Sequence, residues 1–183
     1  MDNYLIIHGS FGSPYSNWFP WLHQKLQEEN KQVVVPYFPF GKEFQNFENW
    51  ANLLDTYRKT RVFSSDTVVI AHSIGCAFIT KYILDRGMII SKLILVAPFN
   101  NYSVDGADYD YVNKTFYSDD LELVKDYVGE IICIYSDNNP YVKQEAFKDF
   151  AEKLEATEII IPNAGHINSE FGYDKFEEIL EYI

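Results

Sequence analysis

The sequence predicts an α/β fold, in which about six mostly parallel strands carry helices on both faces of one sheet. Short runs of branched apolar residues alternate along the chain with longer segments of helical period. Within each run the apolar residues are consecutive rather than alternate, which is typical of strands buried on both faces. With 183 residues, 47% of them hydrophobic, the chain is expected to form one domain over residues 1–183.

The order of elements follows from these two patterns. Strands are expected at 4–8, 33–35, 67–71, 93–96, 131–135 and 158–161. Helices are expected at 16–29, around 47–54, at 74–86, after 118–120, at 143–155 and around 176–183, with Gly87 ending the third. Ligands of parallel sheets bind beyond the carboxyl ends of the strands, so functional residues are expected in the loops that follow them.

Composition excludes several classes of function. A net charge of −12 repels phosphate backbones and anionic lipids, so neither nucleic acid nor a membrane is an expected partner. The chain opens without a basic leader and contains no long uninterrupted apolar window, so a cytoplasmic location is expected. Cys76 and Cys133 lie in apolar stretches and read as buried thiols, and no Cys or His spacing indicates a metal site.

The strongest chemical motif is Ala71-His72-Ser73-Ile74-Gly75, where an expected strand meets an expected helix. A nucleophile elbow turns so tightly that the residues two before and two after the serine must be small. Gly75 meets this demand, and Ala71 replaces the usual first glycine. We therefore predict an α/β-hydrolase fold with Ser73 as nucleophile and the Ile74 N–H as an oxyanion donor. The alternative is that Ser73 only caps the helix.

Two further motifs follow strands. His8-Gly9-Ser10 ends the first strand, and the Ser10 N–H is the expected second oxyanion donor, with Phe11 as the next choice. Ala164-Gly165-His166 follows the last strand. A general base must reach the serine hydroxyl, and the chain order of serine, then acid, then histidine favours His166 in that role.

Taken together, these motifs resemble the small lidless serine hydrolases related to retinoblastoma-binding protein 9. The resemblance runs over nearly the whole chain. It includes His8-Gly9, Gly12-Ser13-Pro14, 17–22, the elbow, Ala97-Pro98-Phe99, 136–142 and 165–168. It implies a parallel sheet without a cap domain, a Ser-Asp-His triad, esterase-like activity on small acyl substrates, and no cofactor.

The acid is where this sequence departs from the family pattern. The resemblance places the acid immediately before Pro140, and this chain has Asn139 there. An amide can orient an imidazole ring, but it cannot neutralise an imidazolium. Asp137 projects to the same side of an extended chain, about 7 Å back, and is the expected substitute if the loop shifts. Asp105, after the fourth strand, is a more remote candidate.

Two functions remain open at this stage. The first is a carboxylesterase-like serine hydrolase that forms an acyl-enzyme on Ser73, with His166 as general base and Ile74 and Ser10 as oxyanion donors. The second is a hydrolase-fold binding or interaction protein whose catalysis is weakened, which is indicated by Asn139 in the place of the acid.

Overall fold

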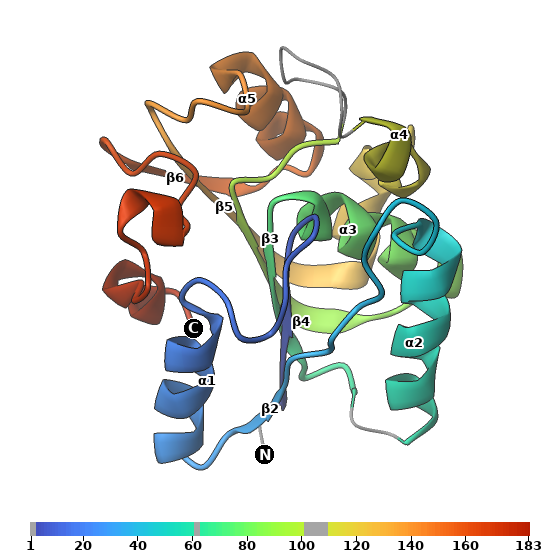
Figure 1. Cartoon of the computed structure of the whole chain (residues 1–183). Coiled ribbons are helices and arrows are strands. Elements are labelled where there is room, and N and C mark those ends of the chain that lie inside the picture. The colour runs from blue at the N-terminus through green and yellow to red at the C-terminus, as the bar shows by residue number, and fades with distance from the viewer. Residues whose placement is uncertain (1–2, 61–62, 101–109) are drawn as a thin grey trace.

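A computed structural model of the chain describes residues 3–60, 63–100 and 110–183 (Figure 1). Six strands form one sheet in the order β2-β1-β3-β4-β5-β6, and every neighbouring pair is parallel. The predicted fold class is therefore confirmed. The strands are β1 (Asn3–Ile7), β2 (Gln32–Val34), β3 (Val68–His72), β4 (Ile90–Val96), β5 (Val128–Ser136) and β6 (Thr157–Ile161).

Helices lie between the strands and cover both faces of the sheet. The α-helices are α1 (Phe19–Glu28), α2 (Phe47–Lys59), α3 (Ile74–Arg86), α4 (Asp110–Asn113) and α5 (Gln144–Lys153). Shorter 3-10 turns are η1 (Lys114–Phe116), η2 (Leu121–Tyr127), η3 (Ser169–Phe171) and η4 (Glu177–Glu181). Asn46 begins α2 by accepting the Asn49 N–H on its side-chain oxygen, and Gly87 ends α3 in the left-handed conformation, as predicted.

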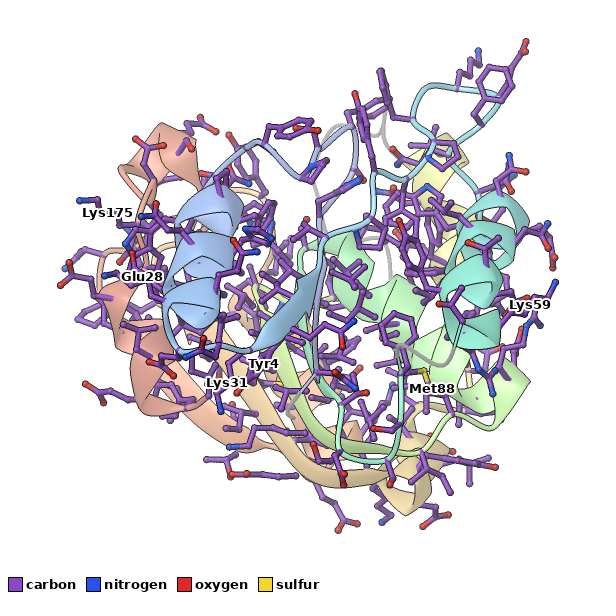
Figure 2. The ribbon with its side chains drawn as sticks, turned by 90° about the horizontal axis from the view of Figure 1, so that it is seen from below. Tyr4, Glu28, Lys31, Lys59, Met88 and Lys175 are labelled. Carbon is purple, nitrogen blue, oxygen red and sulfur yellow. The ribbon has the colours of Figure 1, made fainter. Side chains whose placement is uncertain are left out.

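The core is divided into two layers by the sheet. Alternate residues of the central strands point to opposite faces, so that Leu5 and Ile7 join one cluster and Tyr4 and Ile6 join the other. The first cluster lies under α2, α3 and α5, and the second lies under α1 and η4, on the two sides seen in Figure 1. Figure 2 views the same layers from below, with Tyr4 near the start of β1 and Met88 shortly before β4.

Four local expectations need correction. The C-terminal segment forms the five-residue 3-10 turn η4 instead of an α-helix, and Leu180 is exposed. The edge strands β2 and β6 are partly exposed, because each pairs with a neighbouring strand on one side only. Helix α1 begins at Phe19 rather than at residue 16. The segment after 118–120 is also a 3-10 turn, η2, and it has no side-chain cap. Asp105, the remote candidate for the acid, lies outside the described residues.

Candidate active site

Ser73 lies on the turn between β3 and α3, at the carboxyl edge of the sheet. Its backbone has φ +58° and ψ −130°, a conformation that costs an L-residue about 1–3 kcal/mol. The turn is held because the Ser73 N–H donates to the carbonyl oxygen of Val96 on β4 at 2.9 Å. The Ser73 hydroxyl makes no capping bond to α3, so the helix-cap alternative does not describe this residue.

Gly75 is required by the close approach of α3 to the end of β1. A Cβ atom at this position would lie 2.6 Å from the His8 carbonyl oxygen, which is far inside van der Waals contact. Gly9 is constrained in the same way, since its Cβ would lie 2.9 Å from the Cβ of Ser73. The loop after β1 therefore passes directly against the serine, with the amide of Ser10 following Gly9.

The loop after β1 is braced by two buried amide side chains, Gln45 in the segment before α2 and Asn113 at the end of α4. Gln45, which is 1% exposed, accepts the Phe11 N–H on Oε1 at 2.9 Å. Its Nε2 donates at 3.1 Å to Asn113 Oδ1, which also accepts the Ser10 hydroxyl at 2.7 Å. Of the two candidate oxyanion donors, Phe11 thus has its N–H engaged, whereas the Ser10 N–H has no acceptor among the residues that the structure describes.

His166 brings its imidazole to the serine from the far end of the chain. Its Nε2 lies 3.0 Å from Ser73 Oγ, although the two residues are 93 positions apart. The side chain is almost fully buried, with the rings of His72 and Tyr141 packed edge-on at 5.0 and 5.3 Å between centroids. Burial, and then the neighbouring His72, lower the pKa of His166 well below its usual value, so the resting ring is neutral.

Asn139 is the side chain in contact with the other ring nitrogen of His166. Its Nδ2 lies 2.9 Å from His166 Nδ1, in the position expected for a triad acid. The Asp137 carboxylate points elsewhere and accepts the backbone N–H of Asn163 at 2.8 Å. The structure therefore places Asn139 beside His166, and gives Asp137 a different partner.

Asn139 and Asp137 belong to the segment 136–142, called the acid loop here. It is hydrogen-bonded to the segment 163–169, the histidine loop. Three consecutive side chains of the first accept three backbone N–H groups of the second. The pairs are Ser136 with Ala164, Asp137 with Asn163 and Asn138 with Gly165, each at 2.8 Å. The bonds to Ala164 and Gly165 satisfy backbone groups that would otherwise be buried without a partner, whereas the bond to Asn163 lies at the surface.

Two aromatic side chains hold the histidine loop from the opposite side. His72 Nε2 lies 2.9 Å from the backbone oxygen of His166, and Trp18 Nε1 donates to the oxygen of Ile167 at 3.0 Å. Both rings are buried beside Phe19. The consecutive carbonyl oxygens of His166 and Ile167 are thus fixed by His72 at the end of β3 and by Trp18, which directly precedes α1.

Sequence reasoning did not find these bracing residues. Trp18 is fully buried, and its hydrogen bond to Ile167 crosses 149 positions of the sequence. Gln45 and Asn113 lie in segments without a recognisable motif. The available signal was His72, a polar residue at the end of an apolar run, which requires a buried partner without identifying it.

Neither a membrane span nor a metal cluster is found in the described part of the chain. No helix there is long and apolar enough to cross a bilayer. No group of three or more His, Cys, Asp or Glu side chains is arranged there to bind a metal ion.

The parallel sheet, with a serine on the strained turn after β3, defines an α/β-hydrolase fold, and the described residues include no cap domain. The chain belongs to the serine hydrolase family, whose model matches residues 4–183. The resemblance inferred from the motifs is thereby confirmed. No curated protein sequence matches the chain.

Solved structures support the same fold. The ydeN gene product of B. subtilis has a TM-score of 0.86 and 24% identity, covering 99% of this chain and 96% of its own. Est1E of Butyrivibrio proteoclasticus, with ferulic acid bound, has a TM-score of 0.68 and 19% identity over 97% and 88% of the two chains. The N-formylmaleamic acid deformylase of Pseudomonas putida S16 gives 0.69 and 13% over 99% and 91%.

We predict that Trp18→Phe lowers the free energy of unfolding by at least about 1–3 kcal/mol, because the Ile167 carbonyl oxygen loses its donor while it stays buried. Denaturant unfolding would measure this loss. Trp21→Phe is the matched control, since Trp21 lies on α1 three residues after Trp18 and is only partly buried. Equal losses in the two variants would contradict a special role for the Trp18 hydrogen bond.

The structure also predicts that acid destabilises the protein through His72. Burial lowers the pKa of His72 to about 4, whereas the unfolded chain has an ordinary histidine pKa of about 6.5. Below pH 6.5 the unfolded state takes up a proton that the folded state rejects, so stability falls as the pH drops towards 4. This histidine alone should cost about 2 kcal/mol between pH 7 and pH 5.

Denaturant unfolding at both pH values would measure the effect. His72→Gln keeps an N–H donor for the His166 carbonyl without titrating, so the variant should lose about 2 kcal/mol less than wild type over this interval. His8 and His166, whose pKa values are also lowered by burial, should leave part of the acid sensitivity in place. An identical pH dependence in both proteins would refute the assignment to His72.

Proposed function

We propose that this chain is a carboxylesterase-like serine hydrolase that cleaves small acyl esters through an acyl-enzyme on Ser73. The observation that carries the proposal is the 3.0 Å contact between Ser73 Oγ and His166 Nε2, made at a strained strand-to-helix turn. A hydroxyl and a neutral imidazole at this distance are the parts that nucleophilic acyl transfer requires. Membership of the serine hydrolase family supports the same chemistry.

In the proposed reaction, Ser73 Oγ forms a bond to the acyl carbon as its proton passes to His166 Nε2. The carbonyl electron pair moves to oxygen, and the backbone N–H groups of Ile74 and Ser10 stabilise the negative charge. Collapse of this intermediate expels the alkoxide, which takes the proton from His166. Water then repeats the attack and releases the acid. The structurally similar Est1E holds ferulic acid, a carboxylic acid of the kind that ester cleavage releases.

A fluorophosphonate label tests the proposed nucleophile. Wild-type protein should be modified at Ser73, because the reagent loses fluoride and phosphonylates a serine that a neighbouring base activates. Ser73→Ala should abolish the labelling, while Ser10→Ala, which removes a hydroxyl but keeps the backbone N–H, should retain it. Mass spectrometry of the modified peptide would locate the adduct. Equal labelling of wild type and Ser73→Ala would refute the proposal.

The second candidate is a binding or interaction protein on a hydrolase scaffold with weakened catalysis. Asn139 beside His166 Nδ1 favours it, because an amide cannot stabilise an imidazolium by charge. Ester turnover of the wild-type protein separates the two functions. Turnover no faster than that of Ser73→Ala would favour the binding protein.

Asp137→Asn tests whether a different carboxylate supports His166. The variant keeps the oxygen that accepts the Asn163 N–H and removes only the charge, so we expect little change in kcat. If Asp137 were the acid, kcat should fall by up to about 10⁴-fold, as when a triad Asp becomes Asn. Steady-state ester hydrolysis of the variant and of wild type would decide between them.

A further inference from the structure

The orientation of the Asn139 carboxamide is determined by its surroundings. Its Oδ1 accepts the backbone N–H groups of Tyr141 at 2.9 Å and Val142 at 3.1 Å. Only the oxygen of an amide can accept these bonds, so Nδ2 is the atom that faces His166 Nδ1 at 2.9 Å. Because an amide nitrogen is a donor only, His166 Nδ1 must supply a lone pair.

A neutral imidazole has one N–H, so a ring whose Nδ1 accepts a bond must have its proton on Nε2. We propose that Asn139 is a positioning residue that holds resting His166 in the Nε2–H tautomer, in which the ring donates to Ser73 Oγ and cannot accept its proton. The inference rests on the proposed roles of Ser73 and His166. It adds that the resting site is held in a state that cannot begin the reaction.

The charged ring is disfavoured in this environment. An imidazolium would direct Nδ1–H against the Nδ2–H of Asn139, placing two donors face to face. Among the residues that the structure describes, no carboxylate is in hydrogen-bond contact with the ring. His72 is itself neutral, Tyr141 separates the ring from Glu170 by bonding to that carboxylate, and Asp137 is directed to Asn163.

Reaching the reactive tautomer requires a defined rearrangement. Nε2 must release its proton to water and Nδ1 must take one up, so that the ring stays neutral overall. The Asn139 amide must then turn over, so that Oδ1 accepts the new Nδ1–H. After that turn, Nδ2 faces the N–H groups of Tyr141 and Val142, and both of their hydrogen bonds are lost. The acid loop therefore opposes the tautomer that attack by Ser73 needs.

A carboxylate at position 139 would remove this conflict. One of its oxygens could accept the Tyr141 and Val142 N–H groups while the other accepted Nδ1–H from His166. Its charge would also stabilise the imidazolium formed during attack. The backbone of the acid loop is thus arranged for a carboxylate, and the amide uses the same cradle to select the opposite tautomer.

The tautomer can be observed directly, without any turnover. In protein with ¹⁵N-labelled histidine at pH 7–8, NMR distinguishes a protonated ring nitrogen from one with a lone pair. The His166 signals are assigned by their absence in His166→Gln. We expect Nε2 to be protonated and Nδ1 to be bare in wild type, and the reverse in Asn139→Asp. A protonated Nδ1 in wild type would overturn the inference.

The kinetic consequence is measured on the same variants. Asn139→Asp should raise kcat/KM for an ester by about 10²- to 10⁴-fold, since the reverse change in a serine protease costs about 10⁴ in kcat. Its charge also raises the pKa of His166, so the acid limb of the pH–rate profile should move up by about 1–3 pH units. Asn138→Asp is the matched control: it adds the same charge to the acid loop and keeps its bond to the Gly165 N–H.

The outcomes separate this inference from the proposed function. If Asn138→Asp accelerates the reaction as much as Asn139→Asp does, charge alone explains the gain and the inference fails. Suppose that the fluorophosphonate labels Ser73 and that the His166 tautomer reverses in Asn139→Asp. If kcat/KM then shows no gain, the inference is also refuted. If neither wild type nor Asn139→Asp is labelled, the proposed function fails instead, and the wild-type tautomer stands on the NMR result alone.

Discussion

The contact between Ser73 and His166 depends on how the histidine loop is docked onto the rest of the molecule. This loop has little regular structure of its own, so its backbone groups need partners from elsewhere. The acid loop accepts three of its N–H groups, and His72 and Trp18 bind two of its carbonyl oxygens. A buried polar group without a partner costs about 1–3 kcal/mol, so the buried and partly buried bonds in this set penalise displacement of the loop, while the Asp137–Asn163 bond lies at the surface.

The serine is positioned by a different constraint, which is close packing of the backbone. Ser73 has a strained conformation because β3 must turn into α3 within one residue, and its N–H is tied to Val96 on the neighbouring strand. Gly9 and Gly75 allow β1 and the loop after it to approach Ser73 and the start of α3 more closely than any side chain at these two positions would permit. Ser73, the proposed nucleophile, therefore lies at the edge of the sheet, whereas His166, the proposed base, lies on a loop held by side chains.

The site is organised by neutral histidines and amides rather than by ion pairs. Burial lowers the pKa of His8, His72 and His166, so each ring is neutral, and its hydrogen-bond partners select its tautomer. His8 accepts the Phe38 N–H on Nε2 and donates from Nδ1 to Gly9, while His72 donates from Nε2 to the His166 carbonyl. Asn139 selects the tautomer of His166 in the same way. Exchange of Asn139 for a carboxylate is therefore expected to change both that tautomer and the rate of the proposed reaction.

The sequence by itself determined the parts of this protein that depend on near neighbours along the chain. Consecutive apolar residues indicated the six strands, small residues around Ser73 indicated the elbow, and Gly87 marked the end of α3. These features were predictable because backbone sterics and local burial act over a few residues. The same local reasoning failed at the C-terminus, where the apolar spacing suggested an α-helix and the chain forms a 3-10 turn.

Only the tertiary structure decided the strand order, which side chain faces His166 Nδ1, and which residues brace the loops. Asn139 and Asp137 are two residues apart and could not be ranked by spacing alone. Their directions depend on Tyr141, Val142 and Asn163, which provide N–H donors only once the acid and histidine loops are packed together. Hydrogen bonds between segments far apart in the chain leave no periodic trace in the sequence, because their geometry exists only in the folded molecule.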